Sequence, residues 1–282
     1  MRLVLGAGDG LNAASCDRLI ARLAAADAAR HPEVTIDLQA ATFLDPYGAA
    51  CLCLVARHLA ERQQRLIVVL PSSRRAQLTV AQTGLAAVLR QWSDVRNVPG
   101  HELRAERSGT LPLSLVRSRS DVQAVLSYLV SLAQQRLGFD PGDVLDASKV
   151  VSELCYNVVD HSQVDGLVVA QLGQDRQGRR YVALAVADAG VGIRASLANR
   201  YPEAAHWRHG DAIQQALGGL SSRASGGGVG LRSIYAVVRR YGGRLTIRSG
   251  DQRLHVSAEH PPRSLDGAWF PGAQVGISFS QR

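Results

Sequence analysis

The chain has 282 residues, enough for two domains at about 150 residues each. It carries 32 Lys and Arg against 24 Asp and Glu, a formal charge of +8, and Lys149 is its one lysine. Lys149 lies in Ala-Ser-Lys-Val and not in the Gly-Lys-Ser/Thr of a Walker phosphate loop, so the sequence excludes a Walker-type NTPase.

The positive charge is spread along the chain. Residues 1–110 carry an excess of +3 and residues 111–282 an excess of +5, and no basic run is longer than an Arg-Arg pair. A nucleic-acid interface clusters its basic residues and stacks bases on aromatic side chains, but aromatic residues make up 5% of this sequence. Both observations argue against a nucleic-acid partner.

The sequence also lacks the signals of membrane and secreted proteins. No apolar run approaches the roughly 20 residues of a membrane span, and the apolar start is too short for a signal peptide. The four cysteines have no zinc-like spacing. We therefore expect a cytoplasmic protein without membrane contact, whose cysteines are reduced and mostly in the core.

The first hundred residues alternate between strand and helix patterns. Apolar runs predict strands over 34–38 and 66–70, and the spacing of apolar side chains predicts helices over 15–30 and 47–62. Strands that alternate with helices form βαβ units, so we expect a largely parallel sheet in this part of the chain.

The second of these helices starts after an acidic residue, in Phe43-Leu44-Asp45, and Gly48 follows in its first turn. With the flanking strands, these features make residues 34–85 resemble a STAS domain, the fold of sulfate transporters and anti-sigma-factor antagonists. In that family a serine usually follows the aspartate and is phosphorylated by a partner kinase. Here Pro46 suits the first helical position but has no hydroxyl. Tyr47 could accept phosphate in principle, but we expect it to pack, so the resemblance implies the fold and leaves the phosphorylation switch open.

Residues 96–112 lose apolar periodicity and gain proline, glycine and charge, which predicts a linker. The linker would separate a STAS-like domain over 1–95 from a second domain over 113–282.

The second domain contains a helix with a polar stripe. Asp140 and Pro141 provide an N-cap and a first helical residue, and the helix is predicted to reach about His161. Glu153, Asn157 and His161 are four residues apart and share one face. An amide oxygen can ligate Mg²⁺, and a carboxylate can orient or deprotonate a nucleophile. A solvated face beside a buried one explains the same pattern, so the stripe alone decides nothing.

Two glycine motifs follow the stripe. An apolar strand over 181–187 ends in Asp188-Ala189-Gly190-Val191-Gly192, where the carboxylate can accept hydrogen bonds from an exocyclic amine and the glycines let a planar base approach the backbone. Farther on, Gly226-Gly227-Gly228-Val229-Gly230-Leu231 precedes a helix over 232–241 and offers backbone N–H groups to phosphates. Taken singly, a turn and a glycine-rich linker explain these motifs as well.

The order of the three motifs is more specific than any one of them. Glu-x-x-x-Asn, Asp-x-Gly-x-Gly and Gly-x-Gly-Leu resemble the N, G1 and G2 boxes of the GHKL ATPase superfamily, which includes histidine kinases, anti-sigma-factor serine kinases, type II topoisomerases and Hsp90. The resemblance covers 113–282 and implies a Bergerat-type α/β sandwich, a mixed sheet covered by helices on one face. The expected fold class is therefore α/β in two domains, with a STAS-like sheet and helices first.

The resemblance also implies roles and cofactors. Asp188 would recognise the adenine of ATP, with Gly190 and Gly192 beneath the base. Asn157 would hold Mg²⁺ against the phosphates, and Glu153 would be the general base. The phosphates would lie on Gly226, Gly228 and Gly230, followed by Leu231.

For other positions the sequence leaves alternatives. His161 matches a position that is often histidine in the anti-sigma kinases, and phosphate contact and packing are both open for it. Residues 194–225 would form a lid over ATP, with His206, His209 and Arg223 as candidate phosphate contacts. Many relatives have threonine where this chain has Ala273, so one polar contact near the nucleotide is expected to be missing.

The resemblance favours an ATP- and Mg²⁺-binding regulatory protein of the partner-switching type. It would hydrolyse ATP or phosphorylate a protein Ser/Thr, and the alternative is a non-catalytic module whose nucleotide state switches a protein partner. That partner would be regulatory, of a STAS or anti-sigma type, and a homodimer is a further option because GHKL kinases often pair.

Overall fold

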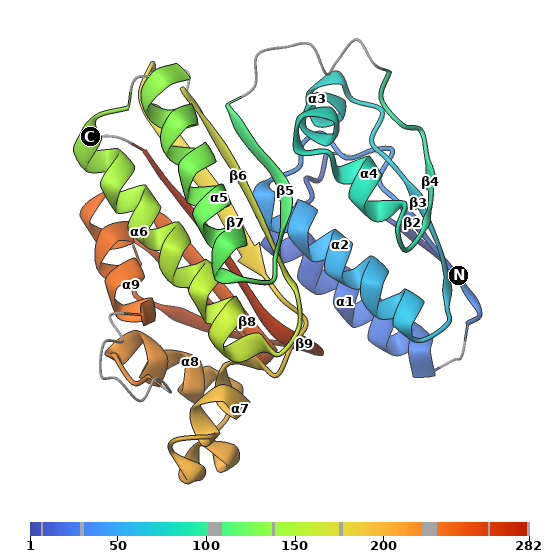
Figure 1. Cartoon of the computed structure of the whole chain (residues 1–282). Helices are drawn as coiled ribbons and strands as arrows, with labels where there is room; N and C mark the ends of the chain where they lie inside the picture. The colour runs from blue at the N-terminus through green and yellow to red at the C-terminus, as the bar shows by residue number, and fades with distance from the viewer. Residues whose placement is uncertain are drawn as a thin grey trace.

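The computed structural model describes residues 1–282 except 7, 29–30, 101–108, 137–138, 175–176, 222–229, 259 and 281–282. The described residues form an α/β protein with a sheet of four strands and a sheet of five. The layers stack in the order sheet, helices, sheet, helices (Figure 1). The second sheet therefore has helices against both of its faces.

The N-terminal half is built from alternating strands and helices. Its elements are β1 (Arg2–Val4), α1 (Ala13–Ala28), β2 (Glu33–Asp37), α2 (Pro46–Glu61), β3 (Arg65–Val69), α3 (Arg74–Thr83), α4 (Leu85–Leu89) and β4 (Asp94–Arg96). The strands pair in the order β1-β2-β3-β4 and are all parallel, as expected from the alternation. Because right-handed crossovers join strands that are neighbours in sequence, the helices gather on one face of this sheet.

Helix α2 starts at the predicted cap. Asp45 Oδ1 accepts a hydrogen bond from the Gly48 N–H at 2.6 Å, and Pro46 follows the cap, where its missing N–H has no cost. A Cβ on Gly48 would overlap the backbone of Leu11, so glycine lets the loop before α1 lie against α2. Burial raises the pKa of the Asp45 carboxyl to about 6.

The C-terminal half contains the five-stranded sheet and the remaining helices. Its elements are β5 (Thr110–Val116), α5 (Arg119–Ser131), the π turn η2 (Leu132–Arg136), α6 (Pro141–Asn157), the π turn η3 (Val158–Ser162), β6 (Gly166–Gln174), β7 (Arg180–Ala187), α7 (Gly192–Ala198), the 3-10 helix η4 (Pro202–His206), α8 (His209–Gly218), α9 (Gly230–Arg240), β8 (Arg244–Ser257) and β9 (Arg263–Ser280). The strand order is β5-β6-β7-β9-β8.

The resemblance implies a mixed sheet, but the strands of this sheet pair antiparallel throughout. The connections explain the difference. Two helices, α5 and α6, join β5 to β6, and because they run in opposite directions they return the chain to the end at which it left the sheet. β6 therefore runs back along β5, while β6–β7 and β8–β9 are hairpins.

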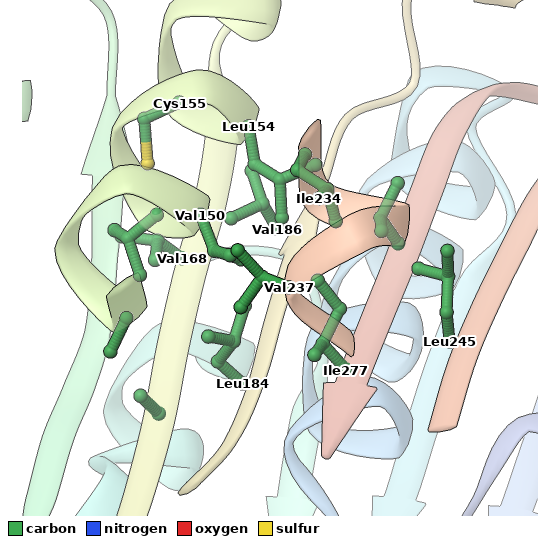
Figure 2. Packing of buried hydrophobic residues seen from close by; sticks show 14 of the residues in the cluster. Val150, Leu154, Cys155, Val168, Leu184, Val186, Ile234, Val237, Leu245 and Ile277 are labelled. Carbon is green, nitrogen blue, oxygen red and sulfur yellow. The ribbon is translucent and has the colours of Figure 1, made fainter. Parts of the chain in front are cut away.

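Helices α5, α6 and α9 cover the outer face of this sheet (Figure 1). Val150 and Leu154 of α6 and Ile234 of α9 pack with Leu184 and Val186 of β7 (Figure 2). Each such side chain contributes roughly 1.5–3 kcal/mol when fully buried. This core positions the end of α6 beside the end of β7, where two of the three sequence motifs lie.

The other face of the sheet packs against the N-terminal half. Leu167, Val169, Ala185 and Ala187 of β6 and β7 belong to the same buried cluster as the apolar residues of α1 and α2. Strands covered on both faces are apolar at nearly every position, which explains the continuous apolar run over 181–187. The expectation of helices on one face is therefore incomplete, because α1, α2 and the five-stranded sheet share a core.

Tyr47 packs in this shared layer, as expected. Its side chain is buried, and a Cβ on Gly276 of β9 would lie 2.8 Å from the tyrosine ring. The Tyr47 hydroxyl is buried without a hydrogen-bond partner among the described residues, and burial raises its pKa. A kinase has no access to a hydroxyl enclosed between a helix and a sheet.

Both ends of the predicted 96–112 linker lie in strands. β4 ends at Arg96 and pairs with β3, while β5 begins at Thr110 and pairs with β6. Residues 101–108 between them lie outside the described part of the chain. All four cysteines are free and buried, as expected for core thiols. Among the described residues, no helix combines the length and apolar character that crossing a membrane requires.

Candidate functional site

A pocket opens at the carboxyl end of β7, bordered by α6, α7, α8 and α9. It contains about 110 Å³ of space that a water molecule can occupy. Its walls are mainly apolar, with Leu154, Val158, Val186, Ile193 and Leu231 among them. The polar residues that line it include Asn157, His161, Asp188 and Arg232.

Asp188 is the buried carboxylate of this pocket. It follows directly after β7, is 6% exposed, and its Oδ1 accepts a hydrogen bond from the Gly190 N–H at 2.8 Å. Burial raises the pKa of Asp188 to about 6, against the opposing effect of backbone hydrogen bonds from Gly190 and Ala273. The carboxyl is therefore largely ionised at neutral pH and can accept hydrogen bonds from a ligand.

The turn after Asp188 requires both of its glycines. A Cβ on Gly190 would overlap the backbone carbonyl of Ser162, which also accepts the Val191 N–H at 3.2 Å. Gly192 has φ +77° and starts α7, and a Cβ there would lie 2.8 Å from Ser249 Oγ. Glycine is thus needed at 190 for space and at 192 for both space and backbone conformation.

Two buried side chains that the motifs did not reveal support this turn. Gln274 is fully buried, and its Nε2 donates to the backbone oxygen of Asp188 at 2.9 Å and to that of Pro271 at 2.8 Å. Ser249 Oγ accepts the Ile193 N–H at 3.0 Å. Polar residues at buried strand positions were the available signal, because such residues need specific partners.

The polar stripe of α6 reaches the pocket in part. Asn157 ends α6, the π turn η3 follows, and both Asn157 and His161 line the pocket. Glu153 is half-buried one turn earlier and is not among the pocket residues. The structure therefore brings Asn157 and His161 together with Asp188 and leaves Glu153 outside the pocket lining.

The third motif is described at its end only. Gly230 has φ +27°, begins α9 and lines the pocket together with Leu231. Gly226 and Gly228 lie outside the described residues, as does Arg223.

Arg232, in the first turn of α9, is a cationic residue that the motifs missed. Its side chain lies near Gly219 and lines the pocket. No carboxylate of a described residue forms an ion pair with it. An arginine two residues after the last glycine of a loop that opens a helix was the signal, because phosphates bind at helix N-termini.

The predicted lid consists of α7, η4 and α8 in its described part. His206 is exposed on η4. His209 forms an ion pair with Asp251 of β8, with Nδ1 2.7 Å from Oδ1. Neither histidine is among the residues that line the pocket.

The site fits an adenine nucleotide. Apolar walls around a buried carboxylate suit a flat base that carries an amino group. Among the described residues, no group of three or more His, Cys, Asp and Glu could hold a metal ion. Mg²⁺ usually keeps several waters and binds through few protein ligands, so a single amide in the pocket, such as that of Asn157, would fit this ion. Ala273 lines the pocket, and its side chain has no hydrogen-bonding group.

Residues 142–264 match the family of histidine kinase-, DNA gyrase B- and HSP90-like ATPases. The matched segment includes all three motifs. This segment is therefore similar to a GHKL ATPase domain. Domains of this family bind ATP, usually with Mg²⁺, and the match supports an ATPase or kinase type of function. Comparison with curated proteins gave no match. The family match does not extend to the N-terminal half, so the STAS resemblance stays a prediction.

Proposed function

We propose that this protein binds ATP and Mg²⁺ and switches a regulatory protein partner, and that it hydrolyses ATP or phosphorylates a protein Ser/Thr. The proposal rests on the burial of the Asp188 carboxylate in the pocket. An ionised, buried carboxylate at the end of an apolar pocket has a high desolvation cost, and a base with an exocyclic amine would compensate for it.

In this proposal each motif residue has one task. Asp188 accepts a hydrogen bond from the adenine amine, and Gly190 and Gly192 let the base lie against the backbone. Asn157 ligates Mg²⁺, which neutralises charge on the phosphates when bound. Glu153 accepts a proton from water or from a protein hydroxyl. The phosphates lie on Gly226, Gly228, Gly230 and Leu231.

Two further side chains extend the phosphate end of the site. Arg232 supplies positive charge at the start of α9, where it lines the pocket. His161 lines the same pocket and donates a hydrogen bond to a phosphate oxygen. With one lysine in the chain, arginine is the main cationic side chain available for this task.

The phosphorylated protein would be another chain. In a STAS-type substrate the acceptor hydroxyl follows the aspartate, but Pro46 has none at that position. Tyr47 is buried between α2 and the sheet, against Gly276. The neighbouring Val275 lines the pocket, and because successive strand residues point to opposite faces, the sheet separates Tyr47 from the nucleotide site.

A non-catalytic nucleotide switch is the second candidate. The observation that favours it is the position of Glu153, which lies outside the pocket lining whereas Asn157 lies within it. In this alternative ATP binds without turnover, and the partner distinguishes the nucleotide-bound state from the nucleotide-free state.

Labelled ATP separates these functions. The wild type, Glu153→Ala and Asn157→Ala are incubated with γ-labelled ATP and Mg²⁺. Free labelled phosphate identifies an ATPase, and label on a co-purified protein identifies a kinase. Either activity should be lost in both variants. ATP binding without turnover would support the nucleotide switch, and a wild type that fails to bind ATP would refute the site.

The partner can be sought with the same three proteins. A pull-down with and without ATP should retain the partner in one nucleotide state only. Light scattering of the purified protein, with and without ATP, distinguishes a homodimer from a complex with another chain.

A further inference from the structure

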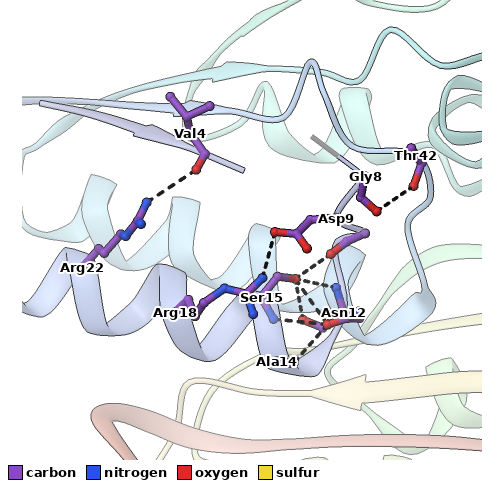
Figure 3. Close-up of polar contacts among 10 residues, drawn as sticks. Val4, Gly8, Asp9, Asn12, Ala14, Ser15, Arg18, Arg22 and Thr42 are labelled. Carbon is purple, nitrogen blue, oxygen red and sulfur yellow. Dashed lines mark hydrogen bonds and ion pairs between the residues drawn. The ribbon is translucent and has the colours of Figure 1, made fainter. Parts of the chain in front are cut away.

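Side-chain hydrogen bonds hold the first turn of helix α1 in the N-terminal half (Figure 3). Asn12 Oδ1 accepts the backbone N–H of Ala14 at 3.0 Å and that of Ser15 at 3.1 Å. Ser15 Oγ donates to the backbone oxygen of Gly10 at 2.8 Å. The first N–H groups of a helix have no partner within it, so these bonds fix the first turn. Because Asp17 lies in the next turn of α1, these bonds also fix its position.

Asp17 forms ion pairs with two arginines of β8, in the C-terminal half. Its Oδ1 lies 2.5 Å from Nη1 of Arg248, and its Oδ2 lies 2.5 Å from Nε of Arg253. The Arg248 side chain is 0% exposed and also donates to the backbone oxygen of Ala268. A buried guanidinium is strongly destabilising without a charged partner, so Asp17 restrains the position of Arg248.

The residue after Arg248 contacts the nucleotide site. Ser249 points to the opposite side of the strand, where its Oγ accepts the Ile193 N–H and donates to the backbone oxygen of Gly272, both at 3.0 Å. It lies directly beneath Gly192, whose Cβ position is 2.8 Å from Ser249 Oγ. The register of β8 on β9 shifts between Ser249 and Gly250, so regular pairing does not hold this point of the strand alone.

We propose that Asp17 is a positioning residue for the nucleotide site. Through its ion pair with Arg248, Asp17 holds β8 in the position in which Ser249 Oγ can accept the Ile193 N–H. The N-terminal half then sets the nucleotide affinity of the C-terminal half without touching the nucleotide.

The coupling acts in both directions, because linkage between two sites is reciprocal. A ligand that orders the turn at Ile193 strengthens the contact between Asp17 and Arg248. Nucleotide binding would thus stabilise the position of α1 against β8. This inference rests on the proposed ATP site, and its test therefore includes a measurement made without nucleotide.

The first measurement is amide hydrogen exchange over residues 189–197 in the nucleotide-free protein. Asp17→Asn and Ser249→Ala should both raise the exchange rate of the Ile193 amide. Ser249→Ala removes the oxygen that accepts this N–H, and Asp17→Asn frees the part of β8 that carries that oxygen. The second measurement is the ATP dissociation constant from calorimetry. Both variants should raise it roughly tenfold, a typical size for coupling between sites. The double variant should show no more than the larger single effect.

The matched control removes another polar contact between the two halves. Arg57 of α2 donates from Nη1 to the backbone oxygen of Asp165 at 3.3 Å. Arg57→Gln should leave both the exchange at Ile193 and the ATP affinity unchanged. Equal effects of Arg57→Gln and Asp17→Asn would mean general loosening and would overturn the proposal.

Asp17→Asn leaves Arg248 without its charged partner and is the variant at risk of not folding. Arg253→Gln removes the second ion pair and keeps the first, so it should act in the same direction with a smaller effect. Wild-type exchange at Ile193 in the folded Asp17 or Arg253 variant would overturn the proposal. Absence of ATP binding by the wild type would refute the proposed function, while the exchange experiment would still decide the coupling.

Discussion

Replacing Asp188 with asparagine should stabilise the protein at neutral pH and remove ATP binding. Burial raises the pKa of this carboxyl from 3.8 to about 6. At 1.36 kcal/mol per pKa unit, this shift corresponds to about 3 kcal/mol of destabilisation once the carboxyl is ionised in both the folded and the unfolded protein. An amide of the same shape keeps an oxygen for the Gly190 N–H and has no charge to desolvate.

The sign of the pH dependence follows from the direction of the shift. The folded protein holds the Asp188 proton more tightly than the unfolded chain does. The free energy of unfolding therefore falls as the pH rises from about 4 to about 6, and stays at the lower level above that. The variant should lack this contribution, so its gain over the wild type should be close to zero near pH 4 and about 3 kcal/mol at pH 7.

Urea denaturation followed by circular dichroism, repeated between pH 4 and 8, measures this difference. Calorimetry at pH 7 measures ATP binding in the same two proteins. The ATP affinity of the wild type should also fall below about pH 6, where Asp188 takes up its proton. A variant that is less stable than the wild type by the same amount at every pH would refute the reasoning.

Asp45 provides a matched control within the same chain. Burial raises its pKa to about 6 as well, and its Oδ1 also accepts a backbone N–H, that of Gly48. Asp45→Asn should change the pH dependence of stability in the same direction as Asp188→Asn. It should leave ATP binding intact, because Asp45 is not among the residues that line the pocket.

Three further substitutions test the packing and the pocket. Gly276→Ala should lower the free energy of unfolding by about 1–3 kcal/mol, because the new Cβ would lie 2.8 Å from the Tyr47 ring. An unchanged melting temperature would contradict the packing of α2 on β9. Arg232→Gln should weaken ATP binding roughly tenfold, the size of a hydrogen bond to a charged group, and adenosine binding far less. Equal losses for both ligands in calorimetry would place this arginine away from the phosphates. Gly190→Ala should abolish ATP binding, since a Cβ would overlap the Ser162 carbonyl, and retained affinity would mean that the turn can move aside.

The sequence predicts those parts of the site that are local in the chain. Asp188, Gly190 and Gly192 lie within five residues, and the buried strand before them and the positive φ at Gly192 follow from short-range rules. The start of α2 is predictable for the same reason, because Asp45 and Pro46 act on the helix that they precede. In each case the residue acts on a segment that directly precedes or follows it in the chain.

Contacts between distant segments are not predictable in this way. Ser249 and Gln274 support the turn after Asp188 from other strands, and nothing in their own neighbourhoods identifies that partner. The ion pair of Asp17 with Arg248 joins residues 231 positions apart. Strand β8 continues as far as Ser257, because its pairing with β9 extends past the bulge at Gly250. Such features depend on register and on how sheets stack.

Helix α2 lies between two sheets and completes the interior of both. Twelve of its residues are buried, from Pro46 to Leu59. A fragment that begins at residue 113 would present Leu167, Val169, Ala185 and Ala187 to water as a continuous apolar surface. Such a surface favours aggregation, so recombinant work on the ATPase domain alone should yield insoluble material where the full chain does not. The two halves should therefore be produced and handled as one chain.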